Sequence, residues 1–250
     1  MIFSFSRLSL YEQCPYRFFN KYILGKKEPV TQPLALGKAV HKAIEDKING
    51  VNHEQAILNG YIEAEFHEEL EYEEISDLVY KAPIQKRMGE TEVYFKLPLS
   101  SKGRTPIIQG YIDVFQPNGT LIDWKTNRVP YNVLDSKQIA LYCWAISQIK
   151  NMEKVEGNYY FLRFRKKSSF VFNQRDMDQA RKWALDLAIE INEKLDLYFL
   201  FPNKYRELFP AKPSRLCQYC PFSVGCFKKF NPFNKKESNA NDANDHIQSS

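Results

Sequence analysis

Apolar residues recur at helical spacing in some stretches of the chain and alternate with polar residues in others. Helical spacing predicts helices from Ser6 towards Cys14, then over 36–50, 51–80, 134–150 and about 175–199. Runs rich in aromatic and β-branched residues predict strands over 91–99, 107–115, 120–126, 157–165 and 169–173. Pro117-Asn118-Gly119 predicts a hairpin turn between the second and third strands. This order indicates an α/β (α+β) fold with a mixed central sheet flanked by helices.

Composition places the chain among globular proteins. Its 250 residues are 44% hydrophobic, which excludes a wholly disordered chain, and no apolar run approaches the ~18 residues that a membrane span needs. Arg7 and Glu12 interrupt the N-terminal stretch, which therefore does not resemble a secretory signal. We expect a cytoplasmic protein with reduced thiols and no membrane association. The polar, low-complexity residues 231–250 are expected to form a disordered tail.

The charge is distributed unevenly. The net charge is +5, yet residues 51–80 contain nine acidic residues and no Lys or Arg, so the rest of the chain is strongly basic. A basic body favours a polyanionic partner such as nucleic acid. The alternative is a set of solvated charged faces that partly neutralise one another.

Three charged residues lie within the predicted hairpin. Asp123 and Lys125 share one face of a strand because they are two residues apart, and Asp113 lies among apolar residues of the neighbouring strand. Two nearby carboxylates suit Mg²⁺ or Mn²⁺, and a lysine beside them can stabilise charge on a phosphate. These groups together could hydrolyse a phosphodiester. The D-x-K spacing alone fits an exposed cross-strand pair better, because so short a pattern is common.

Three further polar residues lie on predicted helices. His41 faces partly inward, as a hydrogen-bonded core histidine or as a further metal ligand. Gln138 and Tyr142 share a helix face four residues apart, which is typical of ordinary packing but also places them where they could line the same cleft.

The cysteines form a more specific pattern. Cys217-x2-Cys220-x5-Cys226 supplies three thiols, and a fourth ligand would come from Cys14 or Cys143. Cys143 lies between aromatic residues of a predicted helix and is interpreted as a core thiol. Cys14 with the other three fits either a [4Fe–4S] cluster or Zn²⁺, and four free thiols are the alternative.

Six segments, taken in order, resemble one nuclease family. The chain is similar to the RecB-type branch of the PD-(D/E)xK nucleases, and more narrowly to the iron–sulfur branch with the CRISPR-associated exonucleases and AddB-type helicase–nucleases. The similarity runs from about residue 4 to residue 227. The segments are FSRLSLYEQCPYRFF, LGKAVHKAIE, GYIDVF, LIDWKTNR, QIALY and CQYCPFSVGC.

The resemblance implies a fold and a set of residue roles. It implies a restriction-endonuclease-like core, with residues 1–230 forming a single nuclease domain whose iron–sulfur lobe comprises about 1–30 and 200–230. Asp123 replaces the Glu that is common in this motif. The implied Mg²⁺ or Mn²⁺ ligands are His41, Asp113 and Asp123; Lys125 would orient or activate water; Gln138 and Tyr142 would support the site or contact DNA; and Cys14, Cys217, Cys220 and Cys226 would hold a [4Fe–4S] cluster, with Zn²⁺ as the alternative.

The resemblance also implies an activity. We expect a metal-dependent DNA exonuclease that acts on single-stranded ends, with partner proteins in repair, recombination or CRISPR adaptation. The alternative is a non-catalytic nucleic-acid-binding or adaptor subunit with the same fold. Arg163, Arg165 and Lys167 alternate in a strand-like run and are candidate phosphate contacts, although a solvated edge strand would look the same. Some of the many Phe and Tyr side chains could stack on unpaired bases.

Overall fold

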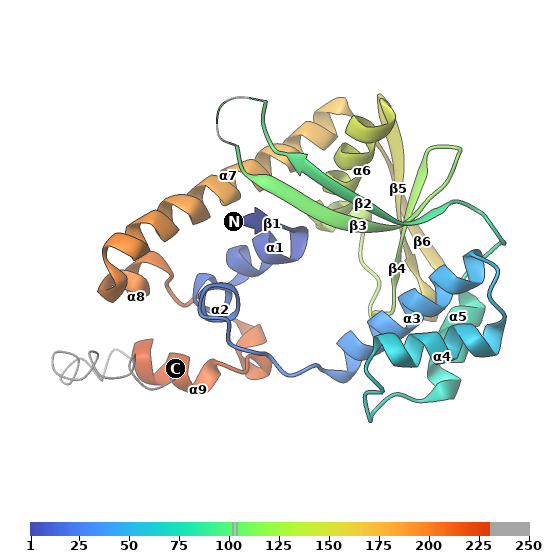
Figure 1. Ribbon diagram of the computed structural model, residues 1–250, viewed down its shortest axis with the longest axis horizontal. Coiled ribbons are helices and arrows are strands. Elements are labelled where there is room, and N and C mark those ends of the chain that lie inside the picture. The colour runs from blue at the N-terminus through green and yellow to red at the C-terminus, as the bar shows by residue number, and fades with distance from the viewer. Residues whose placement is uncertain (102, 104, 231–250) are drawn as a thin grey trace. The chain divides into compact units, whose positions relative to one another are not determined.

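A computed structural model describes residues 1–101, 103 and 105–230 (Figure 1). The predicted tail 231–250 lies outside these residues. None of the helices in the described part is long and apolar enough to cross a membrane. The chain divides into two compact units, the first formed by Met1–Phe5 and Val30–Glu190, the second by Ser6–Pro29 and the described residues from Ile191 onward.

The first unit is built on a six-stranded mixed sheet. The strand order is β1-β3-β4-β5-β6. β2 pairs with β3 along the edge of β3 opposite to β1. β3 pairs antiparallel with β4, β4 parallel with β5, and β5 antiparallel with β6. The mixed sheet flanked by helices confirms the predicted fold class. The strands are β1 (Ile2–Phe3), β2 (Glu90–Pro98), β3 (Ile107–Phe115), β4 (Thr120–Lys125), β5 (Lys154–Phe161) and β6 (Lys166–Asn173).

Helices pack against this sheet through their apolar faces. A buried cluster joins α3 (Gln32–Ile48), α4 (His53–Glu63) and α5 (Tyr72–Lys81) to Val114 of β3 and Trp124 of β4. On α6 (Lys137–Lys150), Ile139 and Cys143 lie against Gly157 of β5 so closely that a Cβ there would be 2.2 Å from Ile139 Cγ2. α7 (Gln174–Leu200) follows β6 and continues into the second unit.

The predicted helices differ from the observed ones at their ends. The acidic segment 51–80 forms two helices, because α4 ends at Glu63 and the next turn has positive φ at Glu65 and Phe66. α3 begins at Gln32 rather than 36, since Pro33 suits the first turn of a helix. α6 begins at Lys137 because the hydroxyl of Ser136 accepts a hydrogen bond from the amide of Gln138 and caps the helix.

The predicted strand over 157–165 is wrong in its second half. β5 ends at Phe161, Leu162–Phe164 form a turn of 3-10 helix, and Arg165 has a left-handed φ of +47°. β6 then returns antiparallel from Lys166. The strand-like run is therefore a tight hairpin, and Arg163, Arg165 and Lys167 do not alternate along one strand.

The second unit joins segments from the two ends of the chain. Phe19 stacks on Tyr205 and Phe209 at ring-centroid distances of 5.6 and 4.9 Å. The amide of Tyr16 donates to the carbonyl of Pro210 at 3.2 Å. These contacts bring the segment after Cys14 against the segment before the three C-terminal cysteines. The helices of this unit are α1 (Phe5–Gln13), α2 (Pro15–Phe18), α8 (Tyr205–Leu208) and α9 (Ser223–Phe230), with a π-helical turn over Phe19–Ile23.

Candidate active site

The site forms where β3 and β4 separate. The two strands pair through Val114 with Ile122 and Phe115 with Leu121. Beyond these pairs, the amide of Trp124 donates a hydrogen bond to the side-chain carboxylate of Asp113 at 2.8 Å instead of to the backbone of β3. The fork thus presents the Asp113 side chain beside the backbone that carries the D-x-K residues.

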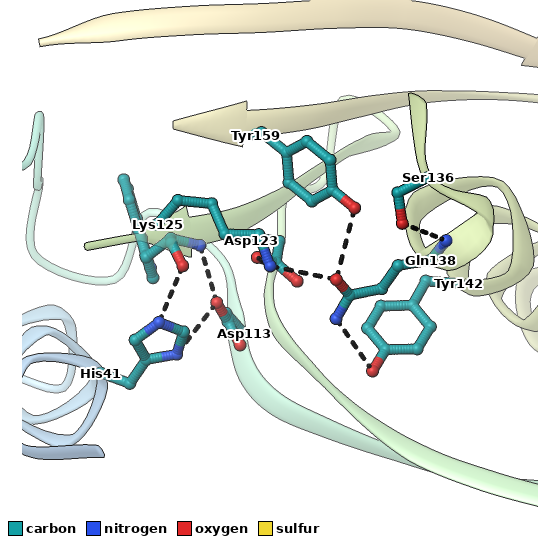
Figure 2. A network of polar contacts seen from close by, with 9 residues as sticks. His41, Asp113, Asp123, Lys125, Ser136, Gln138, Tyr142 and Tyr159 are labelled. Carbon is teal, nitrogen blue, oxygen red and sulfur yellow. Dashed lines mark hydrogen bonds and ion pairs between the residues drawn. The ribbon is translucent and has the colours of Figure 1, made fainter. Parts of the chain in front are cut away.

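His41 of α3 bridges both strands of this fork. Its Nδ1 lies 3.2 Å from Oδ2 of Asp113 (Figure 2). Its Nε2 lies 2.8 Å from the carbonyl oxygen of Trp124. Burial alone would lower the pKa of His41, but the carboxylate of Asp113 outweighs it and raises this pKa to about 9. Both ring nitrogens face acceptors, which is the arrangement of a doubly protonated imidazolium. His41 in turn helps to hold the pKa of Asp113 below its usual range against burial.

Asp123 and Lys125 form the buried ion pair of the site. Asp123 is only 3% exposed, and Nζ of Lys125 lies 2.6 Å from its Oδ2. Burial raises the pKa of Asp123 to about 6, with Lys125 opposing and Asp113 adding to the rise. Among the described residues, Oδ2 of Asp123 accepts no well-aligned hydrogen bond. This carboxylate therefore retains capacity for a further electrophilic partner.

Gln138 of α6 positions the lysine. Its Oε1 accepts hydrogen bonds from Nζ of Lys125 at 3.0 Å and from the hydroxyl of Tyr159 at 3.3 Å. Its Nε2 lies 3.4 Å from the hydroxyl of Tyr142 (Figure 2). Gln138 and Tyr142, predicted to share a helix face, thus meet the D-x-K residues in one network.

Tyr159 is a site residue that sequence reasoning missed. It is the register partner of Asp123 on β5, and Nζ of Lys125 lies 4.6 Å from the centre of its ring. Its signal in the sequence is weak, because tyrosine is common in buried strands and the parallel register of β4 and β5 cannot be derived from local pattern.

Glu92 of β2 is a second missed residue. The register pairs Thr91 with Val114 and Val93 with Ile112, so Glu92 falls opposite Asp113. Burial and the charge of Asp113 raise the pKa of Glu92 to about 7, and its φ of +48° is unusual for a strand residue. The signal in the sequence that could have identified Glu92 is that it is an acidic residue within the predicted strand 91–99.

A cavity of about 530 Å³ opens onto this group. Both acidic side chains and lysines of α3 line this cavity. Its lining comprises Pro33, Leu34, Gly37, Lys38, His41, Lys42, Glu45, Glu63, Glu92 and Asp113.

Gly37 lies one helical turn before His41 and has no evident packing reason to be glycine. A Cβ there would meet only Oγ1 of Thr126, at an ordinary 3.9 Å. We predict that Gly37→Ala raises the free energy of unfolding by up to about 1 kcal/mol, as alanine favours helices. Because the methyl group narrows the cavity, we also predict a slower rate for the nuclease activity that the sequence resemblance implies. Urea unfolding and the cleavage rate measure the two effects, and a destabilised variant would contradict the first.

The donor set fits a divalent cation. Among the described residues, no three His, Cys, Asp or Glu side chains are arranged as a metal-binding group. In this arrangement His41 and Lys125 supply the positive charge that Asp113 and Asp123 require. Oδ2 of Asp123, which pairs with Lys125 but accepts no well-aligned hydrogen bond among the described residues, and the adjacent Asp113 nevertheless supply the carboxylate oxygens that Mg²⁺ and Mn²⁺ prefer.

Four cysteines gather in the second unit. Cys14, Cys217 and Cys220 line one small cavity of about 30 Å³. Burial raises the pKa of Cys226 to about 11, and the nearby Cys14, Cys220 and Cys217 add to the rise. The four residues predicted as cluster ligands are thus near one another, but no three of these thiols are arranged as a metal-binding group in the described part of the chain. Cys143 lies apart in α6 of the first unit, fully buried, as predicted for a core thiol.

The predicted phosphate contacts do not reach the site as a group. Arg163 pairs with Glu74 of α5 at 2.6 Å and donates to the carbonyl of Thr126 at 2.9 Å. Lys167 pairs with Glu156 at 2.8 Å, and Arg165 is exposed in the hairpin turn. A role for these residues in DNA binding stays a prediction.

The fold and the forked Asp113–Asp123–Lys125 arrangement define a restriction-endonuclease-like α/β protein. A model of the PD-(D/E)XK nuclease superfamily matches residues 2–227. The chain belongs to the PD-(D/E)XK nuclease superfamily, which confirms the resemblance at that level.

A solved structure of low sequence identity shares the fold. The crystal structure of "Putative exonuclease" from Eubacterium rectale superposes with a TM-score of 0.54 at 9% identity, covering 88% of this chain and 86% of that one. A crystal structure of SSO0001 gives a TM-score of 0.37 at 18% identity, covering 88% of this chain and 94% of that one. No curated protein has a sequence that matches the chain.

Proposed function

We propose that the protein is a Mg²⁺- or Mn²⁺-dependent deoxyribonuclease that degrades single-stranded DNA from its ends. The observation that carries the proposal is the buried network of Asp113, Asp123 and Lys125, in which Asp113 and the adjoining His41 line a cavity of about 530 Å³. A structural role alone would not require two carboxylates within one buried cluster, since burying charge is costly.

Each side chain has a distinct role in phosphodiester hydrolysis. A divalent ion, when bound, would polarise the phosphate oxygen and lower the pKa of a bound water. Asp113, Asp123 and, after losing its proton, His41 would hold that ion. The Lys125 ammonium, fixed by Gln138 and Asp123, would orient the attacking water and stabilise charge developing on the phosphate. Tyr142 and Tyr159 would keep Gln138 in place.

The proposal is tested with labelled single-stranded and duplex DNA of equal sequence. We expect degradation of the single strand with Mg²⁺ or Mn²⁺ and none with EDTA. Labels at either end distinguish mononucleotide release from internal cleavage. A protein that binds the oligonucleotide but never cleaves it would support a non-catalytic adaptor instead.

We further propose that the four neighbouring cysteines hold a [4Fe–4S] cluster within a lobe of a single nuclease domain over residues 1–230. Two observations support this proposal. Cys14, Cys217 and Cys220 line the same cavity, and, beyond burial, the charges of these three thiols raise the pKa of Cys226. Protein purified without oxygen is expected to be brown, with about four irons per chain. Stoichiometric zinc without colour would contradict the cluster. A cytoplasmic location and partners in repair or CRISPR adaptation stay predictions.

A further inference from the structure

Two large aromatic side chains lie exposed on the strands that carry the site carboxylates. Tyr94 of β2 is 47% exposed and Tyr111 of β3 is 56% exposed. They are register partners, and their ring centroids lie 5.0 Å apart with the planes tilted by 43°. The hydroxyl of Tyr94 donates to Oε1 of Gln109 at 3.2 Å, which fixes one ring to the sheet. The pair forms an aromatic surface that is open to solvent.

This tyrosine pair adjoins the candidate active site. On β3, Gln109, Tyr111 and Asp113 are the less buried positions that alternate with buried Ile108 and Ile112. Two residues of a strand span about 6.4–6.8 Å, so Tyr111 lies one such two-residue step along β3 from Asp113. Glu92 of β2 lies opposite Asp113, two residues before Tyr94 on the same strand.

A basic residue follows on the other side of the pair. Lys96 is exposed on β2 and is the register partner of Gln109. The strands therefore present carboxylates, then two aromatic rings, then a lysine, in successive steps. A chain with a phosphate at the carboxylates, a base over the rings and another phosphate at Lys96 matches this order. Duplex DNA does not, because its bases are stacked inside the helix.

We propose that Tyr94 and Tyr111 form a stacking platform for an unpaired base next to the scissile phosphate. The platform gives the site its selectivity for single-stranded DNA. Base–aromatic stacking tolerates any base, so the platform would favour single strands without selecting a sequence. This inference rests on the proposed nuclease function and assigns its substrate class to two named residues.

The test measures binding and cleavage separately. Binding of a fluorescent single-stranded oligonucleotide is measured in EDTA, where hydrolysis stops, and cleavage is measured with Mg²⁺. We expect Tyr94→Ala and Tyr111→Ala each to weaken single-strand binding by roughly tenfold, with duplex binding unchanged. Tyr94→Phe and Tyr111→Phe keep the rings and should bind nearly as well as the wild type. Tyr80→Ala, at a 78% exposed tyrosine of α5, is the matched control and should leave binding unchanged.

Abasic oligonucleotides locate the stacked base. Removing that base should weaken wild-type binding by the same factor as Tyr111→Ala, and removing both should cost no more. Alanine variants that bind the single strand as tightly as the wild type, or that lose single-strand and duplex binding equally, would overturn the platform. A wild-type protein that shows the predicted binding pattern but cleaves no DNA would support the platform while refuting the nuclease.

Discussion

Lys125→Ala is expected to reduce DNA hydrolysis by about 10²- to 10³-fold or more, the usual loss when one preorganised charge-stabilising donor is removed. Nζ of Lys125 lies between Asp123 and Gln138, at 2.6 and 3.0 Å, so alanine removes the one ammonium from the buried network described here. The loss should fall on kcat more than on KM, because this group acts on charge that develops in the transition state. Single-turnover cleavage of a labelled single strand measures it.

Two comparisons separate chemistry from folding. Lys150→Ala, at an exposed lysine of α6 paired with Glu90 at 2.7 Å, removes an equal charge and should leave hydrolysis unchanged within about twofold. Gln138→Ala leaves the ammonium in place but removes its hydrogen-bond partner, so a smaller loss is expected than for Lys125→Ala. Circular dichroism should show both lysine variants folded. A folded Lys125→Ala protein with full activity would refute the proposed mechanism.

The sequence predicted the local parts of this site well. The alternation over 107–115 and 120–126 and the turn at Pro117-Asn118-Gly119 placed β3 and β4 as a hairpin, because turn chemistry and two-residue periodicity are local properties. The same periodicity put Asp123 and Lys125 on one face of β4. Helical spacing likewise placed Gln138 and Tyr142 together.

Features that depend on distant pairing could not be derived in this way. Glu92 reaches the site through its register with Asp113 across β2 and β3, and Tyr159 through its parallel register with Asp123. Neither register leaves a signal within a short window of sequence. The hairpin over 162–165 was missed because Leu162 and Phe164 continue the apolar pattern of β5, and because the left-handed residue of the turn is Arg165 rather than a glycine.

Trp124→Ala is expected to lower the free energy of unfolding by about 3–5 kcal/mol, the range for truncating a large buried aromatic residue. Trp124 is 1% exposed and packs in the cluster that joins β4 to α3, with its ring 5.7 Å from that of Tyr160. Its backbone also serves the site, because its amide donates to Asp113 and its carbonyl faces His41. Loss of this packing should therefore disturb the fork itself. Urea denaturation measures the effect.

Trp124→Phe distinguishes packing from fork geometry. The indole nitrogen is buried and has no hydrogen-bond partner among the described residues, which costs about 1–3 kcal/mol. Phenylalanine removes that polar atom while it keeps a ring in the core, so its net loss of stability should be well below that of alanine. Because the backbone groups of residue 124 remain, the folded Trp124→Phe protein should retain nuclease activity. Equal destabilisation by both substitutions would show that indole-specific packing, rather than burial of a ring, holds β4 against α3 and keeps Asp123 and Lys125 in register with Asp113.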